Sequence, residues 1–381
     1  MRILFLRNSF EAGGYETLIL AVFRALVNDG ATIETVCLEE PGTLAPALDE
    51  IGIPVHTCPF KGPLDFWAAG RIRKKLQSGP FDLVFLEAGR NVLLAGEYLH
   101  GKLGRPMRIA SIEASVDPSA GEEGLFHARG HRRLLKRADL MIACAETQAR
   151  DLVRRQKLNP SLLKTIVNGV DHEKYRPVPR DQITPFPNGP QPGERSICMV
   201  GSLYEEKGHR FFVEAARETL REVPDARFYI IGEGPAREAI LAQIRDAGLE
   251  ERIVLLGVRD DLADILPHFN AIALTSLRET LALAPIEGMA CGLPAICTDV
   301  GSVRDLVVDG ETGFVVPPAD VNAIAAAFSR MLSNVELRAR MAAASRKRVE
   351  EKFTQERAVR EYVSTFRRYA GEPDPAVEGA G

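Results

Sequence analysis

The sequence lacks several features that would assign it to common protein classes. Its 381 residues contain no apolar run approaching the roughly 20 residues that a membrane-spanning helix needs. The six cysteines form no Cys-x-x-Cys pair and lie in apolar patterns, which predicts buried thiols instead of zinc ligands or disulfides. The opening "MRILFLRNSF" has arginine at position 7 and no long apolar region, so it is read as a buried strand and not as a signal peptide. We therefore expect a cytoplasmic protein.

The charge is small overall but unevenly distributed. The net charge is -4, yet residues 1–180 carry 25 basic and 21 acidic side chains, a balance of +4, and residues 181–381 carry 23 and 31, a balance of -8. The basic residues of the first half gather in "RIRKK" at 71–75 and "HARGHRRLLKR" at 127–137. Such runs indicate either solvated helix faces or a surface for an anionic partner, such as the cytoplasmic face of a membrane. A nucleic-acid partner is not expected.

The chain is long for one hydrophobic core, which favours two domains. In the first 175 residues, short β-branched or aromatic runs alternate with longer amphipathic stretches. This alternation predicts parallel strands covered by helices on both faces. The predicted strands are 2–6, 32–38, 54–58, 82–86, 107–112, 140–145 and 164–167.

The same alternation returns after a proline-rich segment at 176–195, which we interpret as a linker. The strands predicted there are 196–201, 226–232, 252–257, 271–276, 294–299 and 313–317, with helices at 209–223 and 236–248. The predicted fold is α/β, with two facing Rossmann-like domains at 1–175 and 196–365 and a ligand cleft between the carboxyl ends of their sheets. Residues 335–371 are predicted to be helical, with the final helix returning to the first domain. The tail 371–381 is predicted to be disordered.

Glycines follow the strands at three places where a phosphate could be held. Gly13 and Gly14 precede a predicted helix, where free N–H groups and the helix dipole favour an anion, although a tight turn explains them equally well. Lys207, in "GSLYEEKGH", could direct its ammonium at a diphosphate or be a solvated loop lysine. Gly232, in "IIGEGP", lies at a strand end before a helix-starting proline.

Two glutamates frame the stretch "ETLALAPIE". Pro285 favours a helix that begins near Leu283, which puts Glu279 in the preceding loop and Glu287 in the first turn. Carboxylates there can accept hydrogen bonds from backbone amides or from ligand hydroxyls. The alternative for Glu287 is a charge that complements the helix dipole.

The series "GGYE", "VNGVD", "GSLYEEKG", "IGEGP", "LLGVRDDL" and "ETLALAPIEGMACGLPAICTDVGSVRDLVVDGETGFVVPP" resembles glycosyltransferase family 4. These are retaining nucleotide-sugar transferases with the GT-B fold. The resemblance extends from residue 1 to about 365 and is strongest in the second half, around the Glu-x7-Glu pair.

The resemblance implies a role for each matching residue. Glu287 corresponds to the acid that holds the ribose diol, and Glu279 to the acid that contacts the donor sugar. Lys207 corresponds to a lysine on the diphosphate, and Gly14 to the glycine loop that approaches it from the other domain. The backbone amides of Leu281, Ala282 and Leu283 correspond to the loop that cradles the diphosphate. The donor is then a nucleotide diphosphate sugar, and neither a cofactor nor a metal-binding Asp-x-Asp motif is needed.

The sequence departs from the family pattern at four positions. Ser202 replaces a common arginine, and Thr280 and Ala282 replace two glycines. Glu113 stands where many members have histidine. It is a candidate for contacting the donor sugar or the acceptor hydroxyl, and the alternative is an exposed acid at the end of a strand. His127 and His131 follow in the basic stretch.

These patterns predict a retaining glycosyltransferase whose hydroxyl acceptor is lipid-linked or part of an envelope glycan. The predicted catalytic residues are Lys207, Glu279 and Glu113. Two alternatives remain: a sugar-nucleotide epimerase or phosphorylase on the same fold, and a nucleotide-sugar binding protein without turnover.

Overall fold

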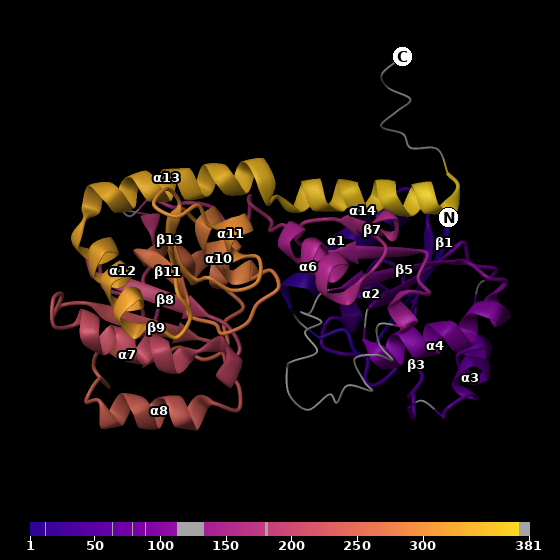
Figure 1. Cartoon of the computed structure of the whole chain (residues 1–381), viewed down its shortest axis with the longest axis horizontal. Coiled ribbons are helices and arrows are strands. Elements are labelled where there is room, and N and C mark those ends of the chain that lie inside the picture. Colours follow the sequence, from indigo (N-terminus) through magenta and orange to yellow (C-terminus); the bar gives the residue numbers. More distant parts are fainter. Residues whose placement is uncertain are drawn as a thin grey trace, which may run out of the picture. The chain divides into compact units, whose positions relative to one another are not determined.

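The computed structural model describes residues 1–11, 13–62, 64–77, 79–87, 89–112, 133–179 and 182–372. The chain divides into two compact units (Figure 1). Unit 1 comprises Met1–Asn168 together with the segment from Glu356 onward, and unit 2 comprises Gly169–Gln355.

Unit 1 is built on a seven-stranded parallel sheet with strand order β3-β2-β1-β4-β5-β6-β7. Every strand predicted in the first half of the sequence is present. The strands are β1 Arg2–Arg7, β2 Thr32–Cys37, β3 Val55–Thr57, β4 Leu83–Glu87, β5 Met107–Ile112, β6 Leu140–Ala143 and β7 Leu163–Thr165. The helices are α1 Gly14–Asn28, α2 Ala45–Glu50, α3 Ala68–Lys75, α4 Arg90–His100, α6 Glu146–Gln156 and α14 Gln355–Ala370, with 3-10 turns η1 Gly101–Leu103 and η2 Pro160–Leu162.

Alternate residues of the unit 1 strands fill two separate cores. Leu4 and Leu6 of β1 join the core on the α3, α4 and α6 side, and Ile3 and Phe5 join the core under α1 and α14. This period-two alternation is what a sheet covered by helices on both faces requires. The chain's final helix, α14, therefore completes the core of unit 1.

Unit 2 contains a six-stranded parallel sheet with strand order β10-β9-β8-β11-β12-β13, the order of a Rossmann sheet. The strands are β8 Ser196–Val200, β9 Arg227–Ile231, β10 Ile253–Leu255, β11 Ala271–Leu274, β12 Ala295–Thr298 and β13 Gly313–Val316. The helices are α7 His209–Thr219, α8 Arg237–Asp246, α9 Leu262–Ile265, α10 Leu283–Ala290, α11 Val303–Leu306, α12 Val321–Ser333 and α13 Val335–Lys352, with 3-10 turns η4 Glu205–Lys207 and η5 Leu266–His268.

Side-chain caps fix where the long helices of unit 2 begin. The Asp320 side chain accepts the Ala323 N–H at 3.0 Å at the start of α12, and the Asn334 side chain accepts the Leu337 N–H at 2.9 Å at the start of α13. Each cap satisfies an amide that the helix itself leaves without a partner.

The proline-rich segment 176–195 belongs to unit 2, where the sequence suggested a linker between domains. The Phe186 ring lies 4.9 Å from the His268 ring, and the Tyr229 hydroxyl donates to Glu194 at 2.6 Å. The division between the units lies at Asn168, a few residues before the predicted boundary at 175. Residues 373–381 of the predicted disordered tail lie outside the described residues.

Candidate functional site

Helix α10 begins at Leu283, as predicted, and it presents an open amino end. Ala282 is its N-cap residue with φ -79° and ψ 114°, and no side chain within the described part of the chain caps it. The first N–H groups of a helix have no partner inside the helix, so an uncapped start offers hydrogen-bond donors and the positive end of the dipole. This start can accept an anion.

The backbone before α10 is formed without the glycines that are common in the family. Ala282 has an ordinary extended conformation, and Thr280 is not among the described non-glycine residues with positive φ. The special requirement lies instead at Gly301, where φ is +54° and a Cβ atom would lie 1.9 Å from the Glu279 carbonyl oxygen. The neighbouring Ser302 N–H donates to the Thr280 carbonyl at 3.1 Å. The loop after β12 thus supports the loop that carries Glu279.

Lys207 and Glu279, 72 positions apart in sequence, form a direct ion pair. The Lys207 Nζ lies 2.8 Å from the Glu279 Oε1, which also accepts the Ser276 hydroxyl at 2.8 Å. The Glu279 side chain is 9% exposed and that of Lys207 is 28% exposed. Two predicted site residues therefore meet, one of them in the segment that leads into α10, and the pair includes a cation that an incoming diphosphate could bind.

Gly208 holds Lys207 in this position. Its φ is +68°, and a Cβ atom there would lie 2.1 Å from the Thr275 carbonyl oxygen. The Thr275 hydroxyl donates to the Gly208 carbonyl at 3.0 Å, and the Leu277 N–H donates to the Glu206 carbonyl at 2.7 Å. The loop after β8 and the loop after β11 are thus joined on both sides of Lys207.

His209 follows this glycine but adds no positive charge near neutral pH. Its side chain is buried, and burial together with the Lys207 charge lowers its pKa to about 4. Lys207 is therefore the residue of this loop that can supply a cation to the site.

Glu287 lies in the second turn of α10, which corrects the predicted first-turn position. The helix starts at Leu283, so four residues separate Glu287 from the open end and its charge cannot act as a cap. Burial raises the pKa of Glu287 to about 7, while a hydrogen bond from the Tyr175 hydroxyl and the nearby Lys174 charge act in the opposite direction. Burial and the same carboxyl group raise the pKa of Tyr175. A carboxyl group in this setting can accept hydrogen bonds from ligand hydroxyls.

Arg346 of α13 fixes the segment that carries Tyr175. Its Nη1 donates to the carbonyl oxygens of His172 at 2.8 Å, Tyr175 at 2.9 Å and Ala290 at 2.9 Å. Tyr175 and Arg346 were not predicted as site residues. "VNGVD" ends four residues before Tyr175, but nothing in that spacing indicates contact with Glu287.

Gly232 has a packing reason to be glycine. Its φ is +143°, and a Cβ atom would lie 2.1 Å from the Gly201 carbonyl oxygen. The Leu203 N–H donates to the Glu233 carbonyl at 2.9 Å, so the loops after β8 and β9 are in direct contact around Ser202. Donor contacts of Gly232 and Ser202 remain predictions.

In unit 1, Gly13 makes room for a carboxylate of the chain itself. A Cβ atom on Gly13 would lie 2.3 Å from the Glu16 Oε2, and Gly14 is the first residue of α1. Arg7 donates to the Glu16 Oε1 at 2.8 Å, and its Nε lies 3.5 Å from the Glu87 Oε2. The Glu16 side chain therefore lies against the start of α1, where the sequence suggested a bound phosphate.

The group Arg7, Glu16 and Glu87 was missed by sequence reasoning. Arg7 is 4% exposed, and its Nε and Nη1 make no hydrogen bond to the described residues. Burial raises the pKa of Glu87. Both residues end neighbouring strands, β1 and β4, at the sheet edge where ligands bind in open α/β sheets. The available signal was a charged residue at the last position of a buried strand.

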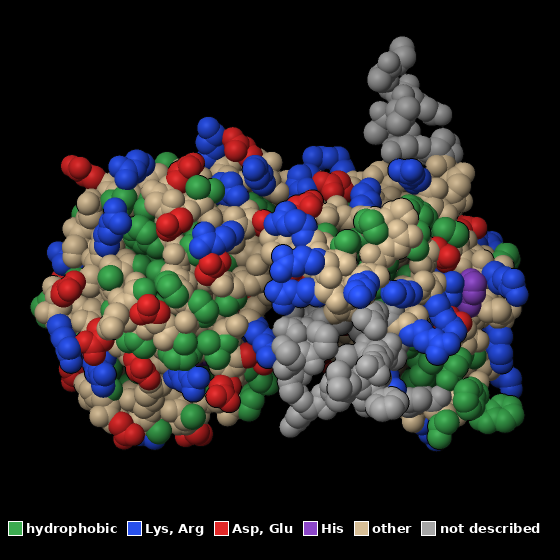
Figure 2. All heavy atoms as spheres, viewed as in Figure 1, with side chains coloured by type: hydrophobic (Ala, Val, Ile, Leu, Met, Phe, Trp, Pro, Cys, Tyr) green, Lys and Arg blue, Asp and Glu red, His purple; other side chains and the backbone are tan. Residues whose placement is uncertain are grey.

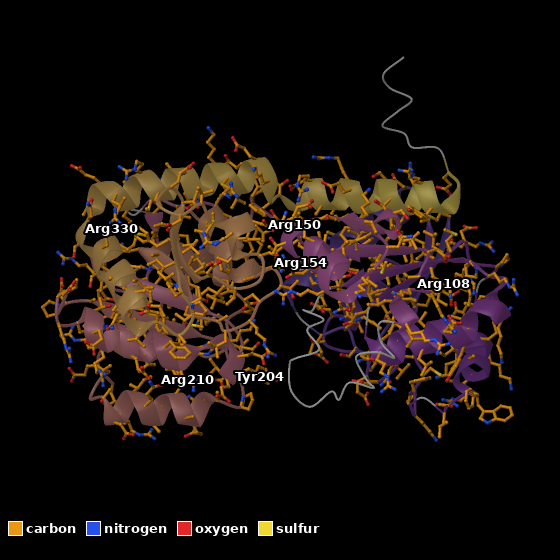
Figure 3. All side chains as sticks on the ribbon, viewed as in Figure 1. Arg108, Arg150, Arg154, Tyr204, Arg210 and Arg330 are labelled. Carbon is orange, nitrogen blue, oxygen red and sulfur yellow. The ribbon has the colours of Figure 1, made fainter. Side chains whose placement is uncertain are left out.

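Some residues that the sequence singled out lie outside the described part of the chain, and others form no ligand or metal site. Glu113, His127 and His131 lie outside the described residues. Figure 3 shows Arg150 and Arg154 on α6 in unit 1, and Tyr204 and Arg210 beside η4 in unit 2.

The six cysteines are free and buried, as predicted. Among the described residues, no group of histidine, cysteine, aspartate and glutamate could hold a metal ion, and no helix is long and apolar enough to cross a membrane.

Comparison with known proteins agrees with this architecture. The model for "Glycosyltransferase Family 4" matches residues 12–174, and that for "Glycosyl transferases group 1" matches residues 181–348. The chain belongs to glycosyltransferase family 4. This family 4 member is similar to Anabaena HepE, whose structure was solved in complex with UDP-glucose. The TM-score is 0.82 and the identity 20%, over 97% of this chain and 100% of that one. Its fold is accordingly of the GT-B type, with two Rossmann-like domains.

Two curated relatives of this family 4 chain carry glycosyltransferase names. It is 26% identical over 232 residues to the N-acetyl-alpha-D-glucosaminyl L-malate synthase of Bacillus anthracis, covering 61% of this chain and 60% of the relative's length. It is 24% identical over 336 residues to the Escherichia coli UDP-Gal:alpha-D-GlcNAc-diphosphoundecaprenol alpha-1,3-galactosyltransferase, covering 84% of each chain.

Proposed function

We propose that this chain transfers a sugar from a nucleotide diphosphate donor to a hydroxyl acceptor with retention of anomeric configuration. The observation that carries the proposal is the 2.8 Å ion pair between Lys207 and Glu279, a glutamate that lies four residues before the uncapped start of α10. This arrangement combines a cation and backbone amides for a diphosphate with a carboxylate for sugar hydroxyls.

Each donor group has a matching partner in unit 2. The diphosphate would bind Lys207 and the amides of Leu281, Ala282 and Leu283. Hydroxyls of the donor sugar would donate hydrogen bonds to Glu279, and the ribose diol would donate to Glu287. Family membership and the fold shared with the UDP-glucose complex of HepE support these assignments.

In the proposed reaction, the bond between the anomeric carbon and the diphosphate oxygen breaks. The acceptor oxygen forms the new bond on the same face of the sugar, and its proton passes to the departing diphosphate. Lys207 and the α10 amides balance the negative charge that grows on the leaving group, which is where fixed donors lower a barrier most. Glu113 is proposed to contact the donor sugar or the acceptor hydroxyl.

For the acceptor we propose a lipid-linked hydroxyl compound at an anionic membrane surface. The E. coli relative named above is a diphosphoundecaprenol galactosyltransferase, and unit 1 carries the basic run at 71–75. The basic residues of unit 1 would hold the protein peripherally at that surface.

A screen followed by product analysis tests the proposal. The unfolding temperature is measured with each of a series of nucleotide diphosphate sugars. The true donor should raise it, because a ligand that binds only the folded state stabilises that state. Labelled donor is then incubated with a panel of hydroxyl acceptors, and the products are separated. The proposal predicts a labelled glycoside with the donor's anomeric configuration.

Other products would identify the alternatives. A changed sugar nucleotide indicates an epimerase, and phosphate-dependent cleavage indicates a phosphorylase. Donor binding with neither transfer nor slow hydrolysis indicates a binding protein. Any of these three results overturns the transferase assignment.

A further inference from the structure

Three large apolar side chains are exposed together at one corner of unit 1. Leu64 is 82% exposed, Phe66 59% and Trp67 81%, all within four consecutive positions. Figure 2 shows hydrophobic side chains in this region, over the start of α3, next to lysines and arginines. Large side chains exposed singly are ordinary, whereas a contiguous apolar group marks a contact surface.

The chain holds this corner in a defined shape. Asp65, between the exposed residues, is itself buried and accepts two hydrogen bonds from Arg71, at 2.9 and 2.6 Å. It also accepts the Lys61 N–H at 3.0 Å, and the Arg71 guanidinium lowers its pKa well below the usual range. Because Asp65 anchors the turn inward, its neighbours on both sides project outward.

Within the described part of the chain, one of the three apolar side chains has an aromatic contact. The Phe66 ring lies 5.3 Å from the Tyr98 ring of α4, which leaves Leu64 and Trp67 as the outermost groups. Tryptophan combines a large apolar face with a polar N–H, and it favours the boundary between water and lipid.

Basic side chains lie on and over α3, the helix that follows the apolar corner. Arg73, Lys74 and Lys75 form the last turn of α3 and are exposed. The Lys102 ammonium lies 3.8 Å from where a Cβ atom on Gly70 would be, so it lies over the same helix. In residues 59–79 the only acidic side chain is Asp65, which is already paired with Arg71.

We propose that Leu64, Phe66 and Trp67 insert into the headgroup region of an anionic lipid membrane, with the α3 and Lys102 cations binding the lipid phosphates. Apolar side chains at a tip with cations around them combine the two attractions that hold peripheral proteins on membranes. A protein partner would have to match a strongly basic rim, whereas an anionic bilayer matches it without specific contacts. This inference rests on the membrane contact proposed above and not on the transfer reaction.

The tryptophan itself provides the measurement. The chain has a single tryptophan, so its fluorescence reports this corner alone. Full-length protein is mixed at low salt with vesicles of phosphatidylglycerol and phosphatidylcholine, and with vesicles of phosphatidylcholine alone. The expected result is a blue-shifted emission, protected from iodide, with the anionic vesicles only. Added salt should weaken the effect because it screens the lysines and arginines.

Matched variants assign the binding to these residues. Trp67→Ala and Leu64→Ser should each lower co-sedimentation with anionic vesicles by about tenfold or more, since each removes one large apolar side chain whose transfer from water into the membrane favours binding. Val335→Ser, at a valine of unit 2 that is 65% exposed, should leave co-sedimentation unchanged. Lys74→Glu should weaken binding to anionic vesicles, and the binding that remains should depend less on salt concentration.

Three results would overturn the inference. They are unchanged emission with anionic vesicles, equal co-sedimentation of wild type and Trp67→Ala, and a blue shift that follows protein concentration without vesicles. The last would identify a protein contact. Donor binding is measured by calorimetry on the same preparations. It separates a failure of the proposed membrane contact from a failure of the proposed transferase function.

Discussion

Glu287 of α10 carries the most informative protonation equilibrium of the candidate site. Burial raises its pKa to about 7, although the Tyr175 hydroxyl donates to it and Lys174 lies nearby. The folded protein then binds more protons than the unfolded chain between the ordinary value of 4.5 and about 7. This group's contribution to folding stability therefore decreases as the pH rises through that window.

Donor affinity should depend on pH in the opposite direction. An ionised carboxylate accepts both hydrogen bonds of a ribose diol, so affinity is expected to rise as the pH increases through about 7. Calorimetric titration with the donor on either side of that pH measures this dependence. Glu287→Gln should remove the dependence, and a wild-type profile that is flat across this window would contradict the assignment.

Lys207→Ala should reduce turnover more than it changes discrimination between donor sugars. The lysine is proposed to balance charge on the leaving diphosphate, and loss of one such group typically lowers kcat by roughly 10² to 10³. Steady-state kinetics with two donor sugars measures both quantities. Lys347→Ala, at a 76% exposed lysine of α13, is the control. Changed sugar preference with normal kcat would be evidence against a diphosphate role.

At the scale of elements, the site depends on short loops that touch each other at glycines. Gly208 has φ +68° and approaches the Thr275 carbonyl, whereas Gly248 has a similar φ of +65° with no atom within 4 Å of an added Cβ. Alanine at either position would strain the backbone to a similar degree, but only at Gly208 would it also clash with a neighbouring carbonyl. Comparing Gly208→Ala with Gly248→Ala therefore separates the clash from the strain.

Gly208→Ala should lower the unfolding temperature more than Gly248→Ala and should also weaken donor binding. Moving the Thr275 backbone would disturb the contact between the loop after β8, which carries Lys207, and the loop after β11, which carries Glu279. Differential scanning fluorimetry with and without donor measures both effects. The opposite result is that the two variants have equal unfolding temperatures and equal increases in that temperature when donor is added. That result would show that the contact between Gly208 and the Thr275 carbonyl has no role in holding the site.

Local patterns predicted the elements well and their contacts poorly. The strands and the start of α10 were predictable because period-two alternation and Pro285 act over a few residues. The Lys207–Glu279 pair spans 72 positions, and Tyr175 reaches Glu287 through a segment held by Arg346. Such contacts arise from strand order and loop packing, which no local pattern encodes. The exposure of Trp67 was likewise hidden, since an aromatic residue in an apolar stretch reads as core.

In the molecule as a whole, α14 follows unit 2 in sequence but contributes to the core of unit 1. Phe366 of α14 is fully buried, and its ring lies 5.0 Å from the Phe85 ring of β4. Phe366→Ala should destabilise unit 1 by about 3 to 5 kcal/mol, as for other buried phenylalanines. Hydrogen exchange should then accelerate in β1 and β4, with Arg360→Ala, an exposed position on the same helix, as control. Unchanged exchange in these strands would mean that α14 contributes little to this core.

Unit 2 is proposed to bind a nucleotide diphosphate sugar through Glu287 and the start of α10. Calorimetric titration of the donor into wild type, Glu287→Ala and the exposed-site control Glu311→Ala tests this claim most directly. Loss of a charged hydrogen-bond partner should weaken binding by about 1.5 to 3 kcal/mol, which is roughly tenfold or more in Kd. We expect that loss for Glu287→Ala alone. Equal donor affinity in all three proteins would contradict it.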